Sequence, residues 1–115
     1  MIQTSVFNES VYPVSEEKIT KALADFFGKK GVSGEVSVAV VGEATMYDLA
    51  KTYLGESHTL HNVLTFRDAE KQGDFVAPGN YLGEIVLCFP VIADEEELLD
   101  LVVHGAKHLL GYHHK

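Results

Sequence analysis

The chain is poor in the residues that mark secreted and membrane proteins. Its 115 residues include a single cysteine, Cys88, and no tryptophan, so no disulfide can form within the chain. Apolar runs stay well below the ~18 residues that a membrane-spanning helix needs, and the first residues lack the basic and apolar segments of a signal peptide. We therefore expect one domain over residues 1–115, in the cytoplasm and not at a membrane.

Positive charge is scarce as well. Arg67 is the only arginine, and 17 acidic residues against 9 basic ones give a net charge of −8. Proteins that hold a phosphate backbone by counterion release usually carry a basic stripe. This composition argues against a generic nucleic-acid-binding protein, and we expect no binding to DNA. Any contact with RNA must depend on a few positive charges gathered at one local site.

The hydrophobic pattern predicts strands and helices in alternation. Strands are expected over 2–7, 36–41, 63–66 and 84–89. Helices are expected over 16–28, 43–54 and 94–110, with residues 67–81 as a loop.

Local signals support the expected helix boundaries. Ser15 is the expected N-cap of the first helix, and Gly28 and Gly31 are expected to end it. The acidic run 94–97 suits the start of the last helix, where the helix dipole favours anions. The order of elements predicts an α+β fold, a single domain in which helices pack on a small mixed β-sheet. Its third and fourth strands are expected to pair antiparallel.

The most informative segment is the C-terminal one, which holds histidines in the spacing H-x3-H-x5-H. His104 and His108 are four residues apart and therefore share one face of a helix. Gly111 offers a left-handed end to that helix, so His114 can turn back toward the pair. The adjacent His113 is the alternative third residue, and we choose His114. Because the surrounding residues are apolar, imidazoles without a partner would be unfavourable here. We therefore expect these histidines to have a binding role.

Three converging neutral imidazoles are a ligand set for a divalent metal. Zn²⁺ is the expected ion, with Ni²⁺ or another divalent metal as alternatives, one per chain. A set of three protein ligands leaves the fourth position open for water, as catalytic sites do. Zinc peptidases of similar spacing carry glutamate directly after the first histidine as a general base. This chain has Gly105 there, which argues against a peptidase.

The histidine segment resembles the C-terminal signature H-G-x-L-H-L-x-G-Y-D-H of the YbeY family of bacterial rRNA maturation factors. Residues 61–66 look like the family's T-D-V-L-S-F segment, and residues 82–87 look like its G-D-I-x-I strand. The resemblance implies an α+β fold, a zinc-like metal on the three histidines, and endoribonuclease activity specific for single strands. It further implies that rRNA and the small ribosomal subunit are the partners.

Departures from the family pattern bear on activity. Leu54 stands where the family has the arginine of a Y-R-G pattern, and His113 replaces the aspartate of the signature. We therefore expect weak nuclease activity. His61 is a candidate acid, base or substrate contact, with a loop histidine of no role as its alternative. Arg67 is a candidate phosphate contact, with a solvated surface arginine as its alternative.

Two other functions stay open beside a nuclease. The acidic charge and Leu54 favour a metallohydrolase of the same fold with a different substrate. The second alternative is a non-catalytic factor that associates with the ribosome and keeps the metal for folding. Metal-dependent turnover of single-stranded RNA separates the nuclease from both.

Overall fold

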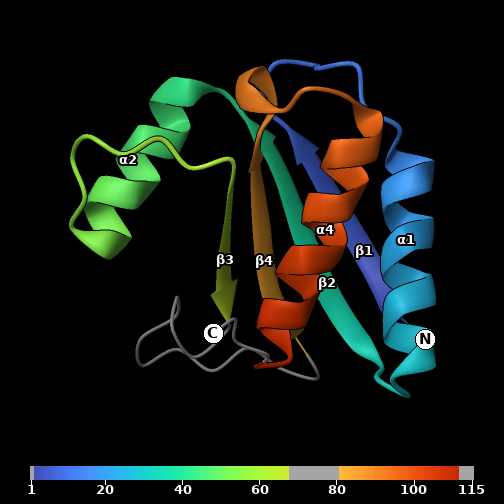
Figure 1. Ribbon diagram of the computed structural model, residues 1–115. Helices are drawn as coiled ribbons and strands as arrows, with labels where there is room; N and C mark the ends of the chain where they lie inside the picture. Colours follow the sequence, from blue (N-terminus) through green and yellow to red (C-terminus); the bar gives the residue numbers. More distant parts are fainter. Residues whose placement is uncertain (1, 68–80, 112–115) are drawn as a thin grey trace.

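The computed structural model describes residues 2–67 and 81–111, which form one sheet with helices on both of its faces (Figure 1). The strands are β1 (Ile2–Asn8), β2 (Gly34–Val41), β3 (Val63–Arg67) and β4 (Tyr81–Cys88). The helices are α1 (Glu16–Lys29), α2 (Glu43–Leu54), α4 (Glu95–Leu109) and the short 3₁₀ turn η1 (Phe89–Val91). Within these residues, no helix combines the length and apolarity needed to span a membrane.

The sheet has the strand order β1-β2-β4-β3. β2 pairs in parallel with both β1 and β4, whereas β3 runs antiparallel to β4. The expected mixed sheet and the antiparallel pairing of the third and fourth strands are thus confirmed. Because β3 and α4 both run away from the carboxyl ends of the other strands, their own carboxyl ends point to the same end of the molecule (Figure 1).

Alternation along the strands divides the apolar side chains between two cores. In β2, Val36, Val38 and Val40 face α1 and α4, while Ala39 and Val41 face α2. Side chains on successive strand residues point to opposite faces of a sheet, so a strand covered on both faces is apolar nearly throughout. Cys88 is buried in the core beneath α2, and this burial raises the pKa of its thiol. It packs as a small hydrophobe, as expected.

Most helix boundaries agree with the expectations. The Ser15 hydroxyl accepts a hydrogen bond from the Lys18 amide at 3.1 Å and so caps α1. Gly28 does not end α1 as expected, because the helix continues to Lys29 and the left-handed residue is Gly31, with φ 69°.

The predicted loop over residues 67–81 is wrong at both of its ends. Arg67 is the last residue of β3 and pairs with Gly83, while Tyr81 begins β4, three residues before the expected start. Pairing with the neighbouring strands extends β3 and β4 beyond their expected ends. Gly83 within β4 has a φ of 145°, which suits glycine. The intervening residues 68–80 lie outside the described part of the chain.

Glu9 supplies the N-terminal cap that α2 lacks in its own sequence. The cap position is Gly42, which has no side chain to offer. The Glu9 carboxylate accepts hydrogen bonds from the Gly42 amide at 2.8 Å and from the Thr45 hydroxyl. These two bonds lower the pKa of Glu9. These bonds connect the segment after β1 to the start of α2, which covers the face of the sheet opposite to α1 and α4.

We expect Glu9→Gln to lower stability at pH 7 by about 0.5–1 kcal/mol, a modest amount because Glu9 is exposed. The folded-state pKa of Glu9 is below its usual value of 4.5. Its stabilising contribution is therefore complete above that value and is lost as the pH falls through the folded pKa. Urea unfolding of both proteins at neutral pH and near pH 3 measures this. A difference that persists unchanged in acid would contradict the capping role, and Asp48→Asn, an exposed site on α2, controls for lost charge.

Candidate metal centre

Gly105 lets α4 lie directly on β3 and β4. A β-carbon at Gly105 would lie 2.9 Å from Cγ2 of Ile85 and 3.0 Å from Cγ2 of Thr65, closer than real side-chain carbons approach. Gly105 is buried, so this turn of α4 contacts the sheet through its backbone. His104 belongs to the same turn, and its position therefore depends on a close helix–sheet contact that the missing side chain of Gly105 permits.

The two helical histidines converge through their Nε2 atoms. These atoms are 3.1 Å apart, and the rings meet edge to face with their centroids 4.7 Å apart. Both side chains are half-buried. A tetrahedral metal with bonds of about 2.1 Å would require nitrogens roughly 3.4 Å apart. The pair therefore fits a shared divalent metal with a shift of only a few tenths of an ångström.

The turn after the pair has the predicted geometry. Gly111 adopts the left-handed conformation with φ 88°, and its amide donates a hydrogen bond to the His108 carbonyl at 2.9 Å. His113 and His114 both lie outside the described residues. Within residues 2–67 and 81–111, no third histidine, cysteine or carboxylate joins the pair. The assignment of His114 as third ligand stays a prediction.

Arg67 lies beside this turn. Leu64 and Phe66 of β3 enter the core beneath α2, so alternation directs Thr65 and Arg67 to the face covered by α4. A β-carbon built on Gly111 would be 3.9 Å from Nη1 of Arg67. The structure therefore brings the only arginine of the sequence to the end of α4 from which His114 follows.

His61 has a different partner. Its Nε2 is 2.5 Å from Oε1 of Glu56, and both residues are partly buried. His61 precedes β3 while Arg67 ends it, and six residues of extended chain span about 20 Å. The structure thus places His61 at the other end of β3 from Arg67, and its role in catalysis stays a prediction.

Leu54 is the last residue of α2, with 47% of its surface exposed, and Gly55 after it is left-handed with φ 70°. The carboxyl ends of α2, β3 and α4 point to one end of the molecule (Figure 1). The position at which the family signature has arginine therefore belongs to the end that carries the histidine pair, although an apolar side chain occupies it here.

Thr65 and Gly83 contribute to the packing of the site, and the sequence analysis did not single them out, although both lie in segments that resemble the family. A β-carbon on Gly83 would lie 2.4 Å from the Phe66 carbonyl oxygen and 2.7 Å from Cδ2 of Leu109. This contact sets the end of α4 against the end of β3. Alternation from Val63 to Arg67 was the available signal for Thr65, since it places Thr65 on the same face as Arg67.

We expect Gly105→Ala to lower stability by about 1–3 kcal/mol and to weaken metal binding, because the added methyl pushes α4 away from Thr65 and Ile85. Lys107→Ala is the matched control, since Lys107 is an exposed neighbour on the same helix and should change neither quantity. Urea unfolding and zinc titration with a competing chelator provide the two measurements. Unchanged stability and zinc affinity in Gly105→Ala would show that the close contact is dispensable.

The chain is similar to known proteins over nearly its whole length. The model of the family described as "Endoribonuclease YbeY" matches residues 3–115. A curated protein of that name from Moorella thermoacetica is 33% identical over 133 residues, covering 98% of this chain and 85% of its own length. Another, from Roseiflexus castenholzii, is 30% identical over 129 residues, covering 100% of this chain and 80% of its own length.

A solved structure shares the fold. The solution structure of TM1509 from Thermotoga maritima superposes with a TM-score of 0.63 at 24% sequence identity, covering 98% of this chain and 75% of that one. At this identity the likeness concerns the fold, and it confirms the expected mixed sheet packed with helices.

Proposed function

We propose that this chain, which belongs to the YbeY family of endoribonucleases, is a metal-dependent endoribonuclease acting on single-stranded RNA. The resemblance of its C-terminal histidine segment predicted this family. The observation that carries the proposal is the pair of Nε2 atoms 3.1 Å apart at the end of α4. We infer that the substrate is rRNA undergoing maturation, that the small ribosomal subunit is the partner, and that the protein works in the cytoplasm.

The proposed ligands are His104, His108 and His114. Zn²⁺ fits this nitrogen set best, with Ni²⁺ or another divalent ion as alternatives. A divalent metal bound there would supply Lewis-acid chemistry, polarising a phosphoryl oxygen and making a water-derived nucleophile accessible at neutral pH. Half-burial of the two helical imidazoles and the packing at Gly105 keep the rings oriented before any metal binds.

Arg67 is the proposed phosphate contact. Its guanidinium lies next to Gly111, and a planar guanidinium can donate two parallel hydrogen bonds to a phosphate. In a chain of net charge −8, such a contact gives the site a local positive charge. Zinc peptidases have a glutamate general base directly after the first histidine. Here that residue is Gly105, which has no side chain and packs against Ile85 and Thr65.

A second candidate, a metallohydrolase with a smaller substrate, is favoured by Leu54. This exposed apolar side chain stands where the family signature has arginine, so one charge for binding an RNA backbone is missing. Purified protein loaded with metal, incubated with a labelled single-stranded RNA with and without chelator, separates the two. Cleavage that stops with chelator and returns with zinc supports the nuclease.

We expect the protein to bind one divalent metal per chain and His108→Ala to lose at least about tenfold in metal affinity together with cleavage. His114→Ala should behave in the same way, whereas His113→Ala should keep both. Elemental analysis and zinc titration measure the metal, and a labelled RNA measures cleavage. Full occupancy in His114→Ala with loss in His113→Ala would reassign the third ligand. Full occupancy in His108→Ala would refute the site.

We expect slow wild-type cleavage of single-stranded RNA, faster cleavage by Leu54→Arg, and loss of the remaining activity in Arg67→Ala with unchanged metal content. A charge-assisted contact made only in the transition state contributes roughly 10²–10³-fold. Single-turnover rates under saturating enzyme provide the measurement. Arg67→Lys is the matched control, since it keeps the charge without the paired donors, and it should fall between wild type and Arg67→Ala.

The outcomes separate the alternatives. Fast wild-type cleavage that neither substitution alters would place the phosphate contact on other residues. Fully metal-loaded variants without any RNA cleavage would favour the metallohydrolase of different substrate or the non-catalytic factor.

A further inference from the structure

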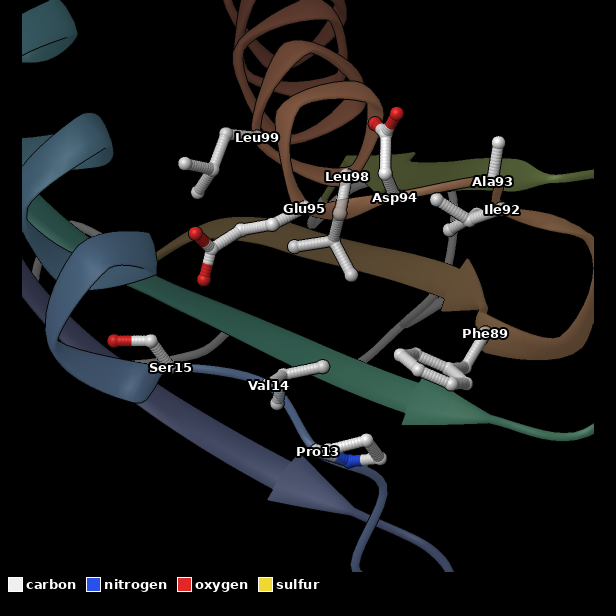
Figure 2. A pocket seen from close by; sticks show the side chains of 10 residues that line it. All are labelled: Pro13, Val14, Ser15, Phe89, Ile92, Ala93, Asp94, Glu95, Leu98 and Leu99. Atoms are coloured by element: carbon white, nitrogen blue, oxygen red, sulfur yellow. The ribbon is translucent and has the colours of Figure 1, made fainter.

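A groove opens at the end of α4 opposite to the histidine pair. It lies between the segment that leads into α1, the turn η1 and the first residues of α4, and it encloses about 100 Å³. Figure 2 shows Val14, Phe89 and Leu98 projecting toward one another from these three elements, with Leu99 above them. A space of this size and lining accepts one aliphatic side chain.

The groove has a strongly acidic rim. Asp94 and Glu95 line the groove itself. The other acidic residues of the rim belong to the first turns of α1 and α4, which begin beside the groove: Glu16, Glu17, Glu96 and Glu97. The one lysine of these turns, Lys18, pairs with Glu95 at 2.8 Å and thereby connects the two helices. The rim therefore carries five net negative charges of the chain's eight.

Part of this charge is explained by the helix starts. The Glu97 amide donates to the Asp94 carboxylate at 2.9 Å, and the Ala93 amide donates to the Glu97 carboxylate at 2.6 Å. Glu16, Glu17 and Glu96 are exposed, and no ion pair engages them within residues 2–67 and 81–111. These three carboxylates are therefore exposed on the first turns of the two helices that border the groove.

We propose that this groove docks a basic segment of a partner protein, in which an aliphatic side chain is flanked by lysine or arginine. The apolar lining receives the aliphatic side chain, and the carboxylates of the rim receive the flanking cations. The same charge repels a phosphate backbone, so RNA is not the occupant. Segments of this composition are common in proteins that are themselves bound to RNA.

The groove and the metal centre can act together. Glu95 and His108 are thirteen positions apart on α4, which corresponds to about 20 Å along the helix. A basic segment held at one end therefore leaves the histidine end free. The proposal goes beyond nuclease activity, because the docking requires neither metal nor RNA.

The test uses the full chain and a fluorescein-labelled peptide in which one leucine is flanked on both sides by lysine and arginine. We expect saturable binding by fluorescence anisotropy that weakens as salt is raised. Replacing the peptide's leucine by serine should weaken binding at least about fivefold, because the apolar anchor is lost. Reversing the peptide's charges should abolish binding.

Matched variants of the protein locate the site. Glu17→Gln/Glu96→Gln removes two rim charges and should weaken peptide binding about fivefold. Glu43→Gln/Asp48→Asn makes the same change of charge at exposed positions of α2 and should leave the affinity within about twofold. Both substitutions spare Asp94, Glu97 and the Lys18–Glu95 pair, and urea unfolding checks that the variants stay folded.

Several results would overturn the proposal. Equal weakening by both double variants would mean attraction by net charge alone, and equal binding of the serine peptide would mean that the groove is not used. An absence of binding at low salt would also reject it. Self-association in sedimentation that the Glu17→Gln/Glu96→Gln variant alters would identify a second copy of the chain as the occupant. No RNA cleavage enters these measurements, so failure of the nuclease proposal would be seen separately.

Discussion

The contact of Gly105 with the strands beneath it is the constraint on which the candidate metal centre depends. Because no side chain separates α4 from Ile85 and Thr65 at this turn, the helix axis is held close to the sheet. The position of the helix in turn sets where His104 and His108 lie, since residues four apart on a rigid helix share one face. A second glycine, Gly83, receives Leu109 at the end of the helix. Packing of this kind orients the ligands in advance and reduces the ordering that metal binding must impose.

Local features of the molecule could be predicted from sequence, and non-local ones could not. The caps at Ser15 and Asp94 depend on residues a few positions away, as does the approach of His108 to His104. The antiparallel pair of β3 and β4 also followed from their order along the chain. The error at Arg67 and Tyr81 arose because the loop prediction followed the polar residues, glycines and proline between them, whereas both ends of that segment pair within strands. Pairing between strands, which exists only in the folded sheet, determines where each strand ends.

Residues of the candidate site differ in the same way. Spacing alone pointed to His104 and His108, whereas Thr65 lies on a strand about forty residues earlier and contacts the helix only after folding. His61 was predicted as an acid, base or substrate contact, and the structure adds that its ring lies against Glu56. The carboxylate comes from the segment after α2, and no periodic pattern in the sequence predicted that approach.

The distribution of charge along α4 explains how an acidic protein can act on RNA. Carboxylates occupy the first turn, where they complement the helix dipole, while the cationic Lys107 occupies the last turn. The two ends are about 20 Å apart, and at physiological ionic strength the Debye length is only about 8 Å. The acidic end therefore contributes little to the potential at the histidine pair. The net charge of −8 includes the four carboxylates of residues 94–97, which lie well beyond one screening length from the histidine pair. Net charge bears on how the whole protein is steered, while the chemistry of a site depends on the charges within about one screening length of it.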